Sequence, residues 1–107
     1  MKRGNFVTVA LQGDFGKPRP ALIIQSDNFT EHSTITILLV SGTTIEAPLL
    51  RINVYPDSNN GLQKESQIMI DKCMTVKKDK IGNILGIANH ETMIEVERAL
   101  AVFLGIV

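Results

Sequence analysis

Short runs of apolar and β-branched residues, separated by turn residues, are the feature that most constrains this chain. The runs are FVTVAL (6–11), ALIIQ (21–25), TITILLV (34–40), LLRINV (49–54), QIMID (67–71), MTV (74–76) and ILGIA (84–88). Runs of this length and composition are typical of strands. Several of them at short spacing predict a small, strongly curved antiparallel sheet or barrel. We expect a mainly β protein (α+β) that forms one domain over residues 1–107.

The end of the chain has a different period. Apolar residues recur there at spacings of three and four, as Met93, Val96, Leu100 and Phe103, and Asn89 is a suitable N-cap. This pattern predicts one amphipathic helix from about residue 90 to residue 104.

Charge and cysteine content give little information about partners. Eleven basic residues balance eleven acidic ones, and there is a single cysteine, Cys73, so no intrachain disulfide can form. The N-terminus does not resemble a signal peptide, and no apolar run approaches the roughly 18 residues of a membrane span. We expect a cytoplasmic protein with no membrane association.

Arg19 lies between two prolines in the stretch GKPRPALIIQSD (16–27). Each proline fixes its own φ and biases the preceding residue toward extended geometry. One interpretation is a stiff loop with a solvated arginine. The other is a pre-positioned guanidinium, whose planar set of donors suits a phosphate. The motif by itself favours the first.

Three further polar segments have both a structural and a chemical interpretation. Asp71 and Lys72 interrupt the apolar pieces of IMIDKCMTV, which indicates either a β-bulge or a functional pair. The hydroxyls of VSGTT (40–44) suit a turn, or an anion if Arg19 is near. The basic run KKDK (77–80) is a solvated surface or one side of a positive groove.

No metal or cofactor site is predicted. His32 and His90 are isolated, and Cys73 has no cysteine partner. No glycine-rich phosphate loop of the Lys-Ser/Thr type is present.

Taken together, several segments resemble the MazF/PemK family of toxin endoribonucleases. They are RGNFVTVAL, GKPRPALIIQSD, ITILLVSG, APLLRINV and SQIMIDKCMTV, followed by the terminal helix. The most specific piece is the G-x-x-R-P-x-L-I-I loop and strand, and the resemblance covers nearly the whole chain.

The resemblance implies an SH3-like, CcdB/MazF-type antiparallel barrel with helical segments packed on it. It also implies a bacterial homodimer that binds single-stranded RNA in a groove and cleaves it without a metal. The expected mechanism is attack of a ribose 2′-OH, which leaves a 2′,3′-cyclic phosphate and a free 5′-OH. The expected partner is a cognate antitoxin whose disordered tail occupies that groove.

The resemblance also assigns catalytic roles. Arg19 corresponds to an arginine that stabilises the phosphorane. Asp71 corresponds to an aspartate that orients or deprotonates the attacking hydroxyl. Ser41 is kept where the family usually has Thr-Ser, whereas Val40 occupies the threonine position, so Ser41 or Thr43 would supply the hydroxyl. Met69 is a second departure, near a position where some members carry another arginine.

Substrate contacts are expected from backbone cations, hydroxyls and stacking. The candidates are Lys17, Lys72, Thr43 and Phe15. Phe15 and Tyr55 are the two rings suited to stacking on bases, although packing roles are open to both.

Two alternatives to the nuclease remain at this stage. One is a non-catalytic, CcdB-type toxin of the same fold that inhibits DNA gyrase through the end of its terminal helix. Here that end reads ALAVFLGIV, without a tryptophan anchor. The other is a degenerate toxin that only binds its antitoxin, which Val40 and Met69 would favour.

Overall fold

The computed structural model describes residues 1–106; Val107, the last residue of the expected domain, lies outside this range. The described chain forms β1 (Asn5–Val9), β2 (Arg19–Ile23), β3 (Thr34–Ser41), β4 (Arg51–Val54), β5 (Ser66–Lys77), β6 (Ile81–Ile87) and α1 (His90–Phe103), with 3-10 turns η1 (Asp27–Phe29) and η2 (Lys78–Lys80). The expected mainly β architecture with one terminal helix is confirmed.

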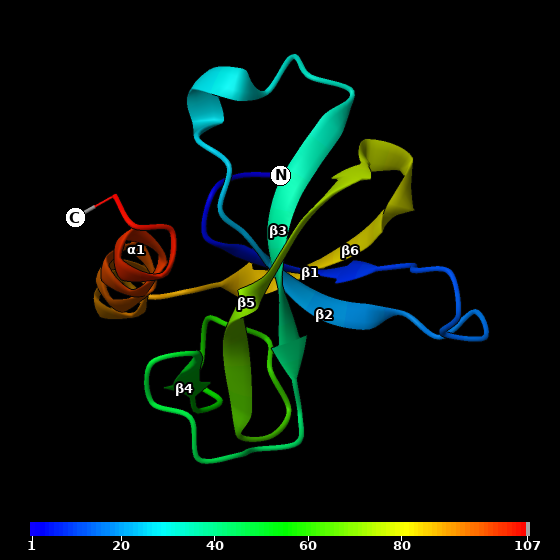
Figure 1. The fold of residues 1–107 in the computed structure, drawn as a ribbon. Helices are drawn as coiled ribbons and strands as arrows, with labels where there is room; N and C mark the ends of the chain where they lie inside the picture. Colours follow the sequence, from blue (N-terminus) through cyan, green and yellow to red (C-terminus); the bar gives the residue numbers. More distant parts are fainter. Residues whose placement is uncertain (107) are drawn as a thin grey trace.

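All strands belong to one strongly twisted antiparallel sheet (Figure 1). Its order is β4-β5-β3-β2-β1-β6, so five of the six strands lie beside a strand that is next to them in the sequence. The exception is β6, which pairs with β1. Antiparallel neighbours can be joined by short turns, which suits the turn-rich segments between the runs. The sheet curls because strands carry a right-handed twist.

Strand β5 differs from the expected pair of short pieces, because it is continuous from Ser66 to Lys77. Its pairing with β3 is irregular. Val40 pairs with Ile68 and Leu38 with Cys73, so β5 advances five residues (68 to 73) where β3 advances two (38 to 40). Extra residues of this kind bend a strand and redirect its side chains. The Asp71–Lys72 pair lies in this bend, which is why the apolar pattern breaks there.

Other boundaries also differ from the sequence-based expectation. Strand β6 begins at Ile81, three residues before the run at 84–88. Strand β4 begins only at Arg51, because the preceding leucines lie in a turn in which Leu50 N–H and Arg51 N–H both donate to the Ala47 carbonyl. A proline at position 48 favours this turn over an extended entrance.

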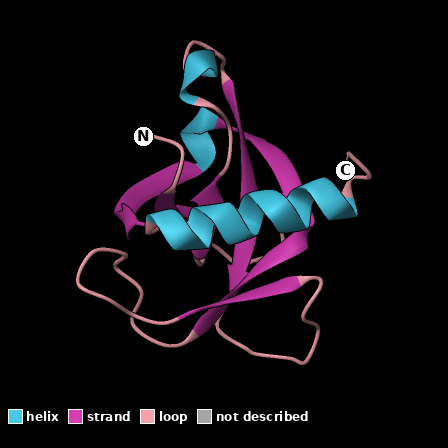
Figure 2. Ribbon diagram, turned by 90° about the vertical axis from the view of Figure 1, so that its left-hand side faces the viewer, coloured by secondary structure: helices cyan, strands magenta, loops and turns pink. Residues whose placement is uncertain are grey.

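The helix α1 lies across one face of the sheet (Figure 2). Its N-cap is Asn89, whose side chain accepts a hydrogen bond from the Thr92 N–H. Met93 and Val96 are buried against the sheet, where α1 contacts β4 and β5. The predicted helix is therefore confirmed to within a residue of its end.

Two apolar cores lie on the two faces of the sheet. We call the one beneath the helix the helix-side core; its buried members are Phe6, Leu22, Leu38, Val40, Ile52, Val54, Ile68, Ile70, Met93 and Val96. The far-side core comprises Val7, Val9, Ala21, Ile23, Ile35, Ile37, Leu39, Met69 and Val76. Because side chains alternate along a strand, this division assigns a face to every strand residue.

The loop after β4 covers the open side of the curved sheet. Asn60 is 1% exposed, and its Nδ2 donates to the Tyr55 carbonyl. The Asn59 carbonyl accepts from the Ile87 N–H of β6 at 2.9 Å. A side chain at Gly86 could not fit, since its Cβ would lie 2.2 Å from that same Asn59 oxygen. The turn-rich segment is thus a fixed part of the fold.

Within residues 1–106, no helix has both the length and the apolar character needed to cross a membrane.

Candidate active site

Arg19 is the first residue of β2, where it pairs with Val9 of β1. The sequence pattern predicts that this strand begins at residue 21. In the structure it begins two residues earlier, so Arg19 belongs to the sheet and not to the preceding loop. Pro20 lacks an N–H, and the ladder between β2 and β3 accordingly begins only at Ala21. Arg19 is held at the start of β2, with its side chain 36% exposed.

Asp14 faces Arg19 from the β1–β2 loop. The distance from Arg19 Nε to Asp14 Oδ2 is 3.9 Å. This carboxylate oxygen is buried and accepts no hydrogen bond from the described residues. A buried acceptor without a donor is costly. The Asp14 side chain is nevertheless 27% exposed, so the rest of its carboxylate can take a hydrogen bond or a proton from a ligand.

Phe15 and Lys17 lie at the tip of the same loop, which projects from the sheet in Figure 1. Phe15 is 97% exposed and Lys17 is exposed as well. Phe15 has a left-handed backbone, with φ of 52°, which turns its ring outward between two glycines of positive φ. Phe15 therefore has no packing role within this chain, and its ring is available to a partner.

A row of polar residues crosses the sheet at the level of Arg19. It comprises Arg19 on β2, Ser41 on β3, Gln67 on β5 and Asn53 on β4. Ser41 pairs with Gln67, and Gln67 pairs with Asn53. The ladder between β2 and β3 ends with the pairing of Ala21 and Leu39, and the same register continued by two residues would set Arg19 opposite Ser41. Neighbouring strands are about 4.8 Å apart, so the row lies within one continuous surface on the far-side face.

Ser41 is already engaged in a turn. Its hydroxyl donates to the Thr43 carbonyl and accepts from the Thr43 N–H, both at 3.0 Å. Val40, by contrast, is 1% exposed in the helix-side core. The expectation that Val40 replaces a site hydroxyl is therefore wrong, because alternation directs it away from the face that carries Ser41.

Lys64 brings an unexpected cation to this end of the sheet. Its side chain crosses Gly42, where an added Cβ would lie 2.3 Å from Lys64 Cε and 2.9 Å from Nζ. The absence of a side chain at Gly42 leaves the space that the lysine side chain occupies. The ammonium group thus lies beside the turn formed by Ser41 and Thr43.

Gln67 fixes the β3–β4 loop to the sheet. Its side chain is buried, and its Oε1 accepts from the Ile45 N–H at 3.0 Å. Its Nε2 donates to the Ile45 carbonyl at 3.0 Å and to Asn53 Oδ1 at 2.8 Å. A buried amide satisfied in this way rigidifies its surroundings.

Asp71 forms an ion pair with Arg51 of the neighbouring strand. Arg51 Nη1 lies 2.5 Å from Asp71 Oδ1, and the two side chains are 13% and 23% exposed. The same nitrogen donates to the Leu50 carbonyl at 3.0 Å. Arg51 is thereby held in place by two acceptors on the far-side face.

This pair determines the protonation state of Asp71. Burial by itself would raise the pKa of Asp71, but the hydrogen bond and the charge of Arg51 outweigh burial and leave the pKa below its ordinary value. Asp71 is therefore ionised at neutral pH and a weak proton acceptor. The geometry suits an orienting role better than deprotonation of a hydroxyl.

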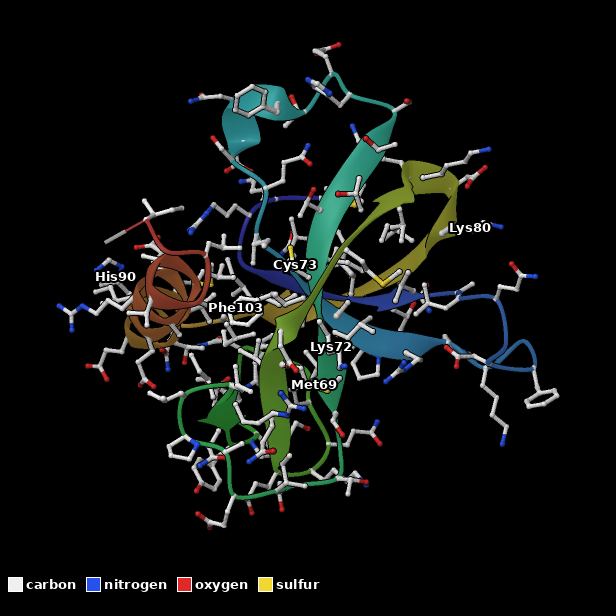
Figure 3. All side chains as sticks on the ribbon, in the orientation of Figure 1. Met69, Lys72, Cys73, Lys80, His90 and Phe103 are labelled. Atoms are coloured by element: carbon white, nitrogen blue, oxygen red, sulfur yellow. The ribbon has the colours of Figure 1, made fainter. Side chains whose placement is uncertain are left out.

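Met69 and Lys72 flank the pair on β5 (Figure 3). Met69 is buried in the far-side core and is the register partner of Arg51. Lys72 is exposed, with its Nζ 4.0 Å from Asp71 Oδ2. Arg51 on the adjacent strand β4 thus places a guanidinium beside Met69.

The predicted residues form two groups rather than one. Arg19, with Phe15 and Lys17 nearby, lies at the β2 end, and Asp71 with Lys72 lies at the bend of β5. No hydrogen bond or ion pair joins Arg19 to Asp71 within residues 1–106. Ser41 lies on β3, which separates β2 from β5 in the sheet.

Sequence reasoning missed Asp14, Arg51, Lys64 and Gln67 as site residues. Arg51 could have been found, because the alternation of LLRINV sends Arg51 and Asn53 to the face opposite Ile52. Lys64 and Gln67 depend on contacts between distant segments and leave no local signal, whereas Asp14 lies only five residues before Arg19, and the conformation of the loop determines that the two meet.

Among the described residues, no three His, Cys, Asp or Glu side chains gather in a way that could hold a metal ion.

Solved structures share this fold. An endoribonuclease from a mycobacterial species, in complex with its cognate antitoxin, superposes with a TM-score of 0.84 at 22% identity over 100% of this chain and 97% of that one. A MazE–MazF complex from Deinococcus radiodurans gives a TM-score of 0.79 at 18% identity, over 98% and 96% of the two chains.

Sequence relatives extend the likeness. The chain is 41% identical to a probable endoribonuclease MazF of Mycolicibacterium smegmatis, over 99% of this chain and 98% of the relative. It is 28% identical to an endoribonuclease MazF of Staphylococcus saprophyticus, over 99% and 92%. Residues 2–104 match a family described as PemK-like, MazF-like toxin of type II toxin–antitoxin system. The chain belongs to this family of PemK-like and MazF-like toxins.

Proposed function

We propose that this chain, a MazF-type toxin endoribonuclease, cleaves single-stranded RNA without a metal ion. The attacking group is a ribose 2′-OH, and the products are a 2′,3′-cyclic phosphate and a 5′-OH. The reaction needs positioning, a cation at the non-bridging oxygens and proton transfer, all of which side chains can supply.

The position of Arg19 carries this proposal. Its guanidinium stays charged at any cellular pH, and its donors fit two phosphate oxygens at once. Its place at the start of β2, within the polar row, supports a role in stabilising the phosphorane. A preorganised donor needs little reorganisation as charge develops.

The carboxylates of Asp14 and Asp71 have different proposed roles in the reaction. We assign acceptance of the 2′-OH proton to Asp14, because its side chain is 27% exposed and its carboxylate lies beside Arg19, with Oδ2 3.9 Å from Arg19 Nε. Asp71, held ionised by Arg51, orients the substrate instead. Ser41 shapes the turn, and the exposed Thr43 supplies the hydroxyl that contacts the substrate.

The remaining predicted residues would hold the RNA strand. Lys17 and Lys72 are exposed cations that suit backbone phosphates. Phe15 presents a free ring at the loop tip, and a base can stack on it.

The partner is a cognate antitoxin, whose disordered tail would occupy the RNA groove. Residues 1–107 would act as a single toxin domain in the bacterial cytoplasm. The mycobacterial structure with a cognate antitoxin supports the antitoxin as the partner class.

A homodimer is the proposed assembly. A groove of about 620 Å³ lies between β4 and α1, lined in part by Leu49, Tyr55, Ala99 and Val102. Leu49, Tyr55 and Val102 are all largely exposed. Exposed apolar surface of this kind is typical of an interface.

Val102→Asp is expected to convert the dimer to a monomer at micromolar concentration, because it introduces a charge into this groove. Sedimentation equilibrium measures the mass. Asn28→Asp adds the same charge at an exposed position of η1 and should leave the dimer intact. A monomeric wild type, or a dimeric Val102→Asp, would contradict the proposed interface.

Cleavage in the presence of EDTA tests the proposed reaction. The purified chain is incubated with a long single-stranded RNA, with and without excess chelator. We expect equal rates and 5′-OH ends that a polynucleotide kinase can label directly. Loss of cleavage with EDTA, restored by a divalent ion, would rule out the metal-independent route.

The family match favours the nuclease over the gyrase-inhibiting alternative. The degenerate-toxin alternative loses its main support, because Val40 belongs to the core and Met69 lies beside Arg51.

A further inference from the structure

A small polar cavity lies next to the polar row, beneath the β3–β4 loop. It has a volume of about 230 Å³ and is lined by residues 44–48 together with Arg51, Asn53, Glu65 and Gln67. We call it the Gln67 pocket. Pockets for drug-sized ligands are typically larger, at roughly 300–1,000 Å³. The Gln67 pocket therefore suits a single planar ring.

The walls of this pocket are fixed before any ligand arrives. Gln67 is 4% exposed and forms hydrogen bonds with both backbone groups of Ile45, so the loop cannot shift without breaking these two partly buried bonds. The same amide donates to Asn53 Oδ1. Asn53 is a member of the lining, and no acceptor within residues 1–106 takes a hydrogen bond from its Nδ2, so this amide group can donate to a ligand.

The charges in the pocket exclude a phosphate. Glu46 and Glu65 are both exposed members of the lining and carry carboxylates. Arg51, the cation in the lining, is engaged with Asp71. Carboxylates repel phosphate but accept hydrogen bonds from N–H groups, as in contacts between Glu or Asp and the amino group of cytosine.

We propose that the Gln67 pocket binds one nucleobase of the RNA substrate and selects a base with an exocyclic amino group over uracil. Glu46 and Glu65 accept from the amino group, while Asn53 Nδ2 donates to a ring nitrogen or carbonyl. This inference rests on the proposed RNA cleavage, and it adds a determinant of sequence preference. Gln67 on β5 is two strands away from Arg19 on β2, which corresponds to about 10 Å. The selected base therefore lies close to the cleaved phosphate.

The test separates base selection from cleavage. Cut sites of the wild type are first mapped on a long RNA. Short fluorescent RNAs around one site are then made uncleavable by a 2′-deoxy group at the attacking ribose. Each flanking position is varied through the four bases, and binding is measured by anisotropy for wild type, the double variant Glu46→Gln/Glu65→Gln, and Glu31→Gln. Glu31 is exposed and outside the pocket, so it controls for loss of negative charge.

We expect one position at which the wild type binds amino-bearing bases about tenfold more tightly than uracil, as a good base contact provides. The double variant should reduce this ratio to about twofold, and Glu31→Gln should retain it. An unchanged ratio in the double variant, the absence of any such position, or no RNA binding at all would overturn the pocket assignment. A wild type that cuts no site on the long RNA would contradict the proposed reaction; the same binding comparison would then be made on short RNAs of randomised sequence, where the preference for amino-bearing bases would leave the pocket assignment in place.

Discussion

Arg19→Ala is expected to lower the rate of RNA cleavage about a hundredfold or more, as when one transition-state donor is removed. The reason is that no other described cation is held at the same end of β2 beside a carboxylate. Lys17 is exposed at the loop tip, and Lys64 lies across the turn at Gly42. Single-turnover cleavage of a fluorescent RNA that contains one mapped site gives the rate.

Arg19→Lys and Lys17→Ala are the matched variants for this experiment. Lysine keeps the charge but not the planar set of donors, so Arg19→Lys should recover only a small part of the rate. Lys17→Ala removes a cation of the same loop. It should weaken RNA binding and have a much smaller effect on the cleavage rate of bound RNA. Equal single-turnover rates for wild type and Arg19→Ala would show that Arg19 does not act on the phosphate.

Arg51→Ala should have the second largest effect, a loss of about 2 kcal/mol in the free energy of unfolding at pH 7. Removing one partner of a buried pair costs about 3–5 kcal/mol, and partial exposure of Arg51 and Asp71 lowers that figure. Urea denaturation measures the change. Arg3→Ala is the control, since its pair with Glu97 is more exposed and should contribute less than about 1 kcal/mol.

The pH dependence of the same pair has a defined sign. The pKa of Asp71 is lower in the folded chain than its ordinary value of about 3.9, so its carboxylate stabilises the fold above that value. The contribution is lost as pH falls through the lowered pKa. The difference in unfolding free energy between wild type and Asp71→Asn should therefore shrink below about pH 4. If Arg51→Ala lowered the free energy of unfolding no more than Arg3→Ala does, this would contradict a tightly held pair between Arg51 and Asp71.

Strand existence was predictable, whereas strand ends were not. The runs at 34–40 and 90–104 correspond closely to β3 and α1, because long periodic patterns leave one way to bury their apolar side. Strand β5 was misjudged as two pieces. Its bend depends on pairing with β3 and β4 at once, and nothing within residues 66–77 specifies that partner geometry.

The candidate site was predictable only in part. The resemblance to the MazF/PemK family singled out Arg19, whereas the two prolines by themselves favoured a solvated arginine in a stiff loop. Gln67 could not be predicted, since its role arises from its contact with Ile45, which lies 22 residues away and which only folding brings near. Val40 was misread for a related reason: the face of a strand residue follows from the register of the whole sheet.

The sequence by itself determined the class of fold, the terminal helix and the placement of Arg19 at a strand entrance, because those properties follow from local periodicity and fixed proline geometry. The tertiary structure decided which groups Arg19 meets. The strand order β4-β5-β3-β2 sets Arg19, Ser41, Gln67 and Asn53 in one row and joins Arg51 to Asp71. Such pairings connect residues far apart in the chain, and only the register of the sheet specifies them.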